Sequence, residues 1–217
     1  MATEPQAIQP PVSSLCTTGL DPYLITGLLL QELREHFLHG ARIEHSRLQG
    51  LRWVPSVADP NTSDVERTTI LLEPVYTWDP RHTQARPAVL VRRDAVKLEN
   101  NRWMGNNMAQ PQFGAGDGSE THIMPITGGH TLLCIATAAG IVETLAMEVA
   151  RLFYRSGLVF TRKFPFNSFM VTQVSEVQRI EESDEHFAVA VQLQYAYTDQ
   201  WTIVQQNPLM KGVNLNG

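Results

Sequence analysis

The chain has 217 residues, of which 43% are hydrophobic and 18% charged, and a formal net charge of −5. This composition is ordinary for a soluble globular protein with one substantial core, and it argues against a nucleic-acid binder that needs a wide basic face. The longest apolar runs fall short of the roughly 18 residues of a membrane helix, and no secretory signal opens the sequence. Cys16 and Cys134 lie far apart, so we expect free thiols in a reducing compartment.

The first residues, 1–19, hold three prolines and no basic side chain, which predicts an extended N-terminal arm. Two interpretations stay open, a disordered tail and an arm laid on a neighbouring subunit. A single α+β domain is expected over residues 20–206, with a long loop insertion at 99–119 and a polar C-terminal tail at 207–217.

The domain begins with a predicted helix. Asp21 is an N-cap acceptor, Pro22 suits the first helical position, and Gly40 is the expected stop. A short strand is expected near residues 51–54. Residues 68–77 are rich in β-branched and aromatic side chains, which predicts a strand with its proline, Pro74, at an edge or a bulge.

Residues 87–93 form the next expected strand, which would pair with 68–77 as a β-hairpin with a long connection. Residues 99–119 are rich in asparagine and glycine and predict a long loop, which either binds something or is disordered. After this loop we expect a short strand over 121–127 and a turn at Gly128 and Gly129.

A strand over residues 130–137 then feeds an amphipathic helix that Ser156 and Gly157 are expected to close. The charged residues Glu143, Glu148, Arg151 and Arg155 are expected off its buried stripe, in an order that complements the helix dipole.

The last part of the domain is predicted to be mainly β. Residues 159–169 read as a basic and aromatic connection, and 169–181 as a strand. Residues 187–197 alternate large apolar with small or polar side chains, so the apolar face should lie on the helices, and 201–204 could extend the strand. The fold class is therefore α+β: a mixed or mainly antiparallel sheet packed by two helices, with an extended arm and an Asn/Gly-rich loop.

The common catalytic signatures are missing, so no catalytic, cofactor-binding or metal-binding residue is assigned and no cofactor is expected. The glycines at 114, 116 and 118 fit a flexible loop better than a phosphate cradle. His36 and His39 share a helix face and could hold a metal with Glu32 or Glu35, but exposed helix-end histidines are the more ordinary interpretation.

Two further arrangements were weighed. A small hydrolase could use four ionisable residues whose spacing sets no constraint: Glu73, Asp79, His122 and His130. Asp94 and Lys97 come nearest to a nuclease pattern, but their spacing and turn-like context fit it poorly.

Two groups of opposite charge are the candidate subunit-contact or lumen residues. The basic cluster contains Arg81, Arg86, Arg92, Arg93, Lys97 and Arg102, and the acidic run contains Glu181, Glu182, Asp184 and Glu185. In an oligomer the two could meet between subunits, a heterologous contact that closes rings. The alternative, that both are solvated turns, stays open.

Four stretches carry a family resemblance: ILLEPVYTWDP, RPAVLVRRD, GGHTLLCIATAAGIVETLAMEVARLF and FAVAVQLQYAY. In order and character they resemble the neck and tail-completion proteins of tailed bacteriophages, in particular the tail terminator group. The resemblance covers roughly residues 66–200 and depends on the pattern of elements.

The resemblance implies a structural virion protein of the neck or tail, assembled in the host cytoplasm. Such subunits form a homo-oligomeric ring, commonly a hexamer, that caps the tail tube and joins it to the head connector. The expected partners are other copies of the chain, the connector and tail tube proteins, and genomic DNA in transient non-specific contact; no membrane partner is expected. The alternatives are the small hydrolase and a monomeric binding module.

Overall fold

The computed structural model describes residues 15–16, 20–38, 43, 45–54, 68–78, 87–98, 112–113, 119–180 and 186–204. The chain divides into two compact units, and each is described by itself. The larger unit contains Leu20–Leu98 and Ile126–Tyr197, and the smaller contains Met1–Gly19, Glu99–Pro125 and Thr198–Gly217. Within the described part of the chain, no helix is both long and apolar enough to cross a membrane.

The larger unit begins with α1 (Pro22–Leu38). Asp21 caps this helix as predicted, because its Oδ1 accepts a hydrogen bond of 2.6 Å from the backbone N–H of Leu24. The buried residues of α1 recur every three or four positions, which is the spacing of one helix face: Ile25, Leu29, Leu33 and Phe37. The predicted stop at Gly40 lies outside the described residues.

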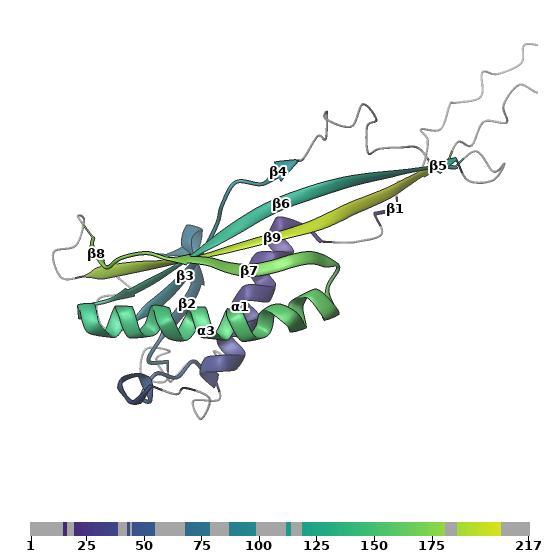
Figure 1. The fold of residues 1–217 in the computed structure, drawn as a ribbon. Coiled ribbons are helices and arrows are strands. Elements are labelled where there is room, and N and C mark those ends of the chain that lie inside the picture. The colour runs from purple at the N-terminus through teal and green to yellow at the C-terminus, as the bar shows by residue number, and fades with distance from the viewer. Residues whose placement is uncertain are drawn as a thin grey trace, which may run out of the picture. The chain divides into compact units, whose positions relative to one another are not determined.

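The fold is α+β, with a mixed sheet and two long helices (Figure 1). The strands of the larger unit are β2 (Leu71–Pro74), β3 (Ala88–Arg93), β4 (Lys97–Leu98), β6 (Ser119–Ala136), β7 (Phe166–Val174), β8 (Gln178–Arg179) and β9 (Phe187–Val204). Their order is β9-β6-β3-β2, with β7 and β8 paired to β9 and β4 paired to β6. β2 and β3 are parallel, whereas β3–β6, β4–β6, β7–β9 and β8–β9 are antiparallel.

The smaller unit contains the first residues of β6 and the last residues of β9. β1 (Leu15–Cys16) pairs with β9 at Thr202 and Trp201, and β5 (Gln112–Phe113) pairs with β6 at Thr121 and Glu120. β9 therefore includes the predicted extension. The other residues of the predicted arm, most of the predicted loop and the tail at 207–217 lie outside the described residues.

The predicted hairpin of 68–77 with 87–93 is wrong. β2 and β3 run parallel, with Leu71 opposite Ala88, because the connection is long enough to return the chain to the same end of the sheet. The connection begins with η3 (Val75–Thr77), which ends β2 earlier than predicted. β2 is the last strand in the sheet order, so Pro74 lies on an edge strand as expected.

The strand predicted at 51–54 is absent from the structure. Arg52 and Val54 donate their backbone N–H groups to the hydroxyls of Thr69 and Thr68. Side-chain hydroxyls thus take the place of a strand partner, which pattern reasoning along one segment does not reveal.

The predicted turn at Gly128 and Gly129 is also wrong, since both glycines lie inside β6. A Cβ on Gly128 would lie 2.7 Å from Cε2 of Tyr195, and one on Gly129 would lie 3.0 Å from the carbonyl oxygen of Leu193. The glycines are therefore needed where β9 and its tyrosine approach β6 closely.

The second long helix, α3 (Ala139–Lys163), continues beyond its predicted end. Ser156 and Gly157 are buried inside it. The Ser156 hydroxyl donates to Glu32 Oε1 of α1 at 2.6 Å, and a Cβ on Gly157 would lie 3.3 Å from the carbonyl oxygen of Phe169. These small residues permit close packing and do not close the helix. The predicted connection at 159–169 is thus partly helical, and β7 begins at Phe166.

Both long helices lie on the same side of the sheet in the larger unit (Figure 1). The alternation predicted for β9 is confirmed, because its large apolar side chains are buried on that side: Val189, Val191, Leu193, Tyr195 and Tyr197. Aromatic rings fill the space under α3, where Phe160 stacks on Phe169 with centroids 4.8 Å apart. The opposite face of the sheet holds a smaller core of Leu71, Ala88, Leu90 and Ile135.

Candidate assembly surface

The predicted basic cluster is divided between two faces of the sheet. Arg92 pairs with Thr131 and Arg93 with His130, so these neighbouring side chains leave β3 on opposite faces. Arg92 Nε lies 3.4 Å from Asp94 Oδ1, which partly neutralises it. Arg93 and Lys97 are exposed. The remaining predicted charges lie outside the described residues: Arg81, Arg86, Arg102, Glu181, Glu182, Asp184 and Glu185.

The residues of the hydrolase hypothesis do not converge in the described part of the chain. Glu73 is opposite Leu90, which is opposite Leu133, so these three share a face of the sheet. His130 is three positions from Leu133 along β6 and therefore emerges on the other face. Asp79 lies outside the described residues, as does the side chain of His122.

His130 is buried in the core between α1, β6 and β9. Its Nε2 lies 2.8 Å from Thr26 Oγ1, and its ring centroid is 5.6 Å from that of Tyr195. Burial lowers the pKa of His130 to about 4, an effect that Asp94 opposes and Arg93 reinforces. Burial likewise raises the pKa of the Tyr195 phenol. Both side chains are neutral near pH 7, and their place in the core indicates a packing role.

A second buried polar pair links the two long helices. His36 Nε2 lies 3.1 Å from Glu148 Oε1, and both residues are buried. His36 was expected to be exposed and Glu148 to lie off the buried stripe, so both expectations are wrong. Each polar group offsets the cost of burying the other, which a hydrophobic pattern cannot reveal.

The possible metal ligands near His36 are dispersed. Glu32 accepts a hydrogen bond from Ser156, and Glu35 accepts one of 2.9 Å from Gln31. His39 lies outside the described residues. Among the residues that the structure describes, no three His, Cys, Asp or Glu side chains are grouped to hold a metal ion.

The outer face of α3 carries large apolar side chains that the protein leaves in solvent. Tyr154 is 80% exposed, Leu158 69% and Met147 43%. Two exposed arginines, Arg151 and Arg155, interrupt this apolar series. Large apolar groups gathered on one face mark a surface that is covered in a complex.

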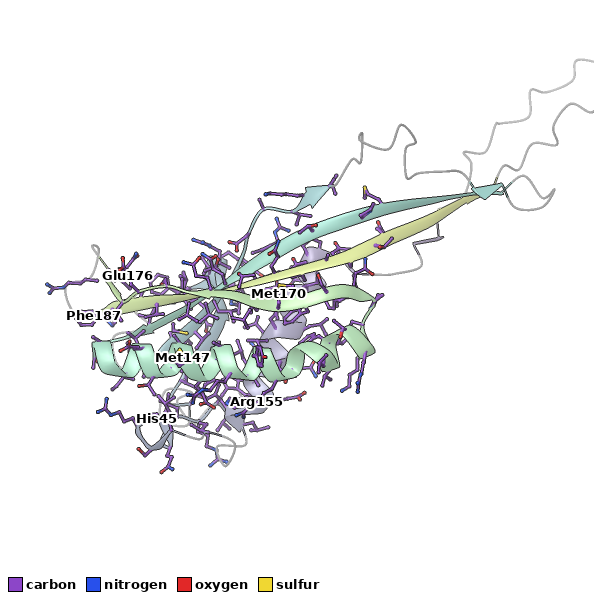
Figure 2. All side chains as sticks on the ribbon, viewed as in Figure 1. His45, Met147, Arg155, Met170, Glu176 and Phe187 are labelled. Atoms are coloured by element: carbon purple, nitrogen blue, oxygen red, sulfur yellow. The ribbon has the colours of Figure 1, made fainter. Side chains whose placement is uncertain are left out.

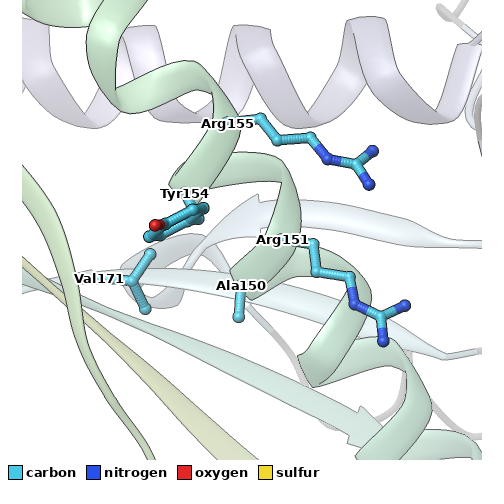
Figure 3. Close-up of a pocket in the computed structure, with 5 residues that line it drawn as sticks. All are labelled: Ala150, Arg151, Tyr154, Arg155 and Val171. Carbon is cyan, nitrogen blue, oxygen red and sulfur yellow. The ribbon is translucent and has the colours of Figure 1, made fainter.

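The middle of this face is hollowed. A groove of about 430 Å³ lies between α3 and β7, lined by Ala150, Arg151, Tyr154, Arg155 and Val171 (Figure 3). The Tyr154 ring and Val171 face one another, while both arginines extend from α3 on the same side of the close-up. We call these five residues the α3 groove. It combines an apolar floor with two cations, which suits an acidic segment that has apolar neighbours.

The strand beside the α3 groove is β7, which in the described residues pairs only with β9. Its register shifts between Phe166 and Ser168 and again between Val171 and Gln173. Such irregularities hinder the addition of a further strand to an edge. Met170 on β7 is 50% exposed and is labelled with Met147 and Arg155 in Figure 2. We therefore expect this side of the protein to bind through side chains.

This surface escaped the sequence analysis, although the sequence contains a signal for it. Met147, Tyr154 and Leu158 lie seven and four positions apart, which places them together on the charged side of the helix. Apolar residues that recur on a polar helix face indicate a partner.

The architecture defines a class, an α+β protein with a mixed sheet and two helices on one face. Comparison with protein-family models gives no match, and comparison with curated proteins finds no relative.

Proposed function

We propose that this protein is a structural subunit of a bacteriophage neck or tail. Copies of it form a homo-oligomeric ring, a tail terminator or head-to-tail connector, that caps the tail tube and joins it to the head connector. DNA passes through the lumen of this ring without being read. The ring is a hexamer and is part of the virion.

The observation that supports assembly most directly is the exposed apolar face of α3. Burying one large side chain such as Tyr154 or Leu158 stabilises a complex by roughly 1.5–3 kcal/mol. The isolated chain leaves both more than two-thirds exposed, at 80% and 69%. A subunit that meets its own copies in every assembled particle gains this stabilisation each time.

The resemblance to tail terminators supplies the identity of the assembly. The α+β fold on which that resemblance depends is present: a mixed sheet, a long helix after β6 and a long C-terminal strand. The net charge of −5 also suits a DNA conduit, because a strongly basic lumen would retain DNA.

The mass of the purified protein in solution tests the proposal. One chain has a mass of 24.3 kDa, so six copies give about 146 kDa by light scattering after gel filtration. Negative-stain images of the same fraction are expected to show rings. A protein that remains at 24.3 kDa at the highest attainable concentration, alone and with tail tube protein, would contradict the ring.

Two deletions test which segments contribute to assembly. Removing residues 1–19 or shortening 104–118 is expected to reduce the ring fraction, because arms and loops of this composition gain order on neighbours. The thermal unfolding of the remaining protein should change little. Normal rings from both shortened chains would show that neither segment contributes.

A further inference from the structure

The two arginines of the α3 groove are placed for a carboxylate partner. Arg151 and Arg155 lie one turn apart on α3, and like charges at this spacing destabilise a helix by roughly 0.2–0.5 kcal/mol. The carboxylate nearest in sequence, Glu148, is buried and bonded to His36. A carboxylate bound between the two guanidinium groups would turn this repulsion into attraction.

The same chain contains an acidic segment of suitable length. Residues 181–185 read EESDE and join β8 to β9. The ends of this connection are held in place, because Ile180 donates its N–H to the His186 carbonyl at 3.0 Å and Arg179 is opposite Phe187. A connection anchored at both ends loses less entropy on binding than a free tail.

The segment cannot reach the α3 groove of its own chain. Val171, which lines the groove, is opposite Leu193 on β9. Leu193 is seven residues beyond His186, or about 23 Å along an extended strand at ~3.3 Å per residue. A five-residue connection extends only about 10 Å from its anchors. The groove is therefore left to a segment from another molecule.

From these observations we propose that the α3 groove binds the acidic segment 181–185 of a second copy of this chain. The carboxylates of Glu181, Glu182, Asp184 and Glu185 pair with Arg151 and Arg155, and apolar residues beside them cover Tyr154. The inference rests on the proposed function, since it describes the contact between neighbours in the ring.

The two halves of this contact are different surfaces, so the contact is heterologous. Each copy offers its groove to one neighbour and its acidic segment to the other, and a chain of such contacts closes when the rotation between copies allows it. The predicted pairing of the acidic run with the β3–β4 arginines has the same logic but a different basic partner. Reversing charges distinguishes the two.

The experiment uses three forms of the full chain. The groove variant carries Arg151→Glu and Arg155→Glu, and the segment variant carries lysine at 181, 182, 184 and 185. The third form combines both sets. The matched control, Arg93→Glu with Lys97→Glu, makes the same charge change on exposed residues of the β3–β4 cluster. Circular dichroism and thermal unfolding confirm that each form is folded.

The groove and segment variants should each weaken self-association at least about tenfold, the effect of losing two exposed ion pairs and gaining repulsion. The combined form should assemble again, because both charges are reversed. An equal mixture of the two single variants should also assemble, since each contact then pairs opposite charges. The control should assemble as the wild type does.

If the wild type forms rings and the groove variant does so equally well, the inference is overturned while the proposed function stands. Weakened single variants that neither combination nor mixing restores would show that the groove and segment bind other surfaces. Loss of assembly in the control alone would assign the contact to the β3–β4 cluster. A wild type that stays monomeric would overturn the inference and the proposed function together.

Discussion

Acidification should destabilise this protein through His130, before most of its carboxylates titrate. The pKa of His130 is about 4 in the folded protein and 6.5 in the unfolded chain. Between these values the unfolded chain binds more protons than the folded one, so the free energy of unfolding falls as the pH falls. Above pH 6.5 the neutral imidazole contributes no such dependence.

The size of the effect follows from the two pKa values. Each pKa unit corresponds to ~1.36 kcal/mol, so the difference between 6.5 and about 4 amounts to about 3 kcal/mol once the pH reaches 4. This is a large part of the stability of an ordinary domain, roughly 5–15 kcal/mol. The physical origin is that a charged imidazole would lie in the core, where Thr26 supplies its one hydrogen bond.

Urea unfolding at a series of pH values measures this directly. His130→Gln can keep a hydrogen bond to Thr26 but cannot titrate, so its free energy of unfolding should fall less between pH 6.5 and pH 4 than that of the wild type. His45→Gln, at a half-buried residue outside the core, serves as the matched control and should retain the wild-type slope. Equal slopes for the wild type and His130→Gln would refute the reasoning.

Three further substitutions test the packing. Gly128→Ala should destabilise the protein by about 1–3 kcal/mol in urea unfolding, because the new Cβ would lie 2.7 Å from the Tyr195 ring, and unchanged stability would show that the ring can move aside. Gly27→Ala, with no atom within 4 Å of the new Cβ and a helical site, should instead stabilise it by roughly 0.5–1 kcal/mol. Asp21→Ala removes the acceptor for Leu24 and should cost about 0.5–2 kcal/mol, visible as a lower thermal midpoint, whereas Asp21→Asn should cost much less.

The elements that sequence analysis predicted well are those whose cause is local. α1 has its capping aspartate, proline and apolar stripe within one stretch of chain. β9 has its alternation within the residues 187–197. In both cases the signal and the structure involve the same few neighbours in sequence, so no distant contact is needed to predict them.

The wrong predictions share a different origin. Gly128 reads as a turn residue, and only the Tyr195 ring, distant in sequence, explains its place inside a strand. Gly157 reads as a helix stop, and only the nearby Phe169 carbonyl explains its place inside α3. Small residues carry two meanings, a bend in the chain or room for a neighbour, and the sequence around them does not separate these.

The candidate surface was predicted in part. The analysis identified the acidic run as a contact but paired it with arginines that β3 and β4 separate. His36 and Glu148 were missed because a buried polar pair forms between helices and leaves no pattern in either one. The exposed apolar residues of α3 could have been found from their helical spacing, had the charged face been examined as closely as the buried one.

The two polar links between α1 and α3 have a consequence for how rigidly the outer face is presented. Ser156 meets Glu32, and His36 meets Glu148. Sliding either helix by one turn, ~5.4 Å, would break both links at once and strand four polar groups in the interior. Apolar contacts alone would tolerate such slippage far better. The helix pair is thus indexed like a key in its slot, and every copy offers a neighbour the same docking angle.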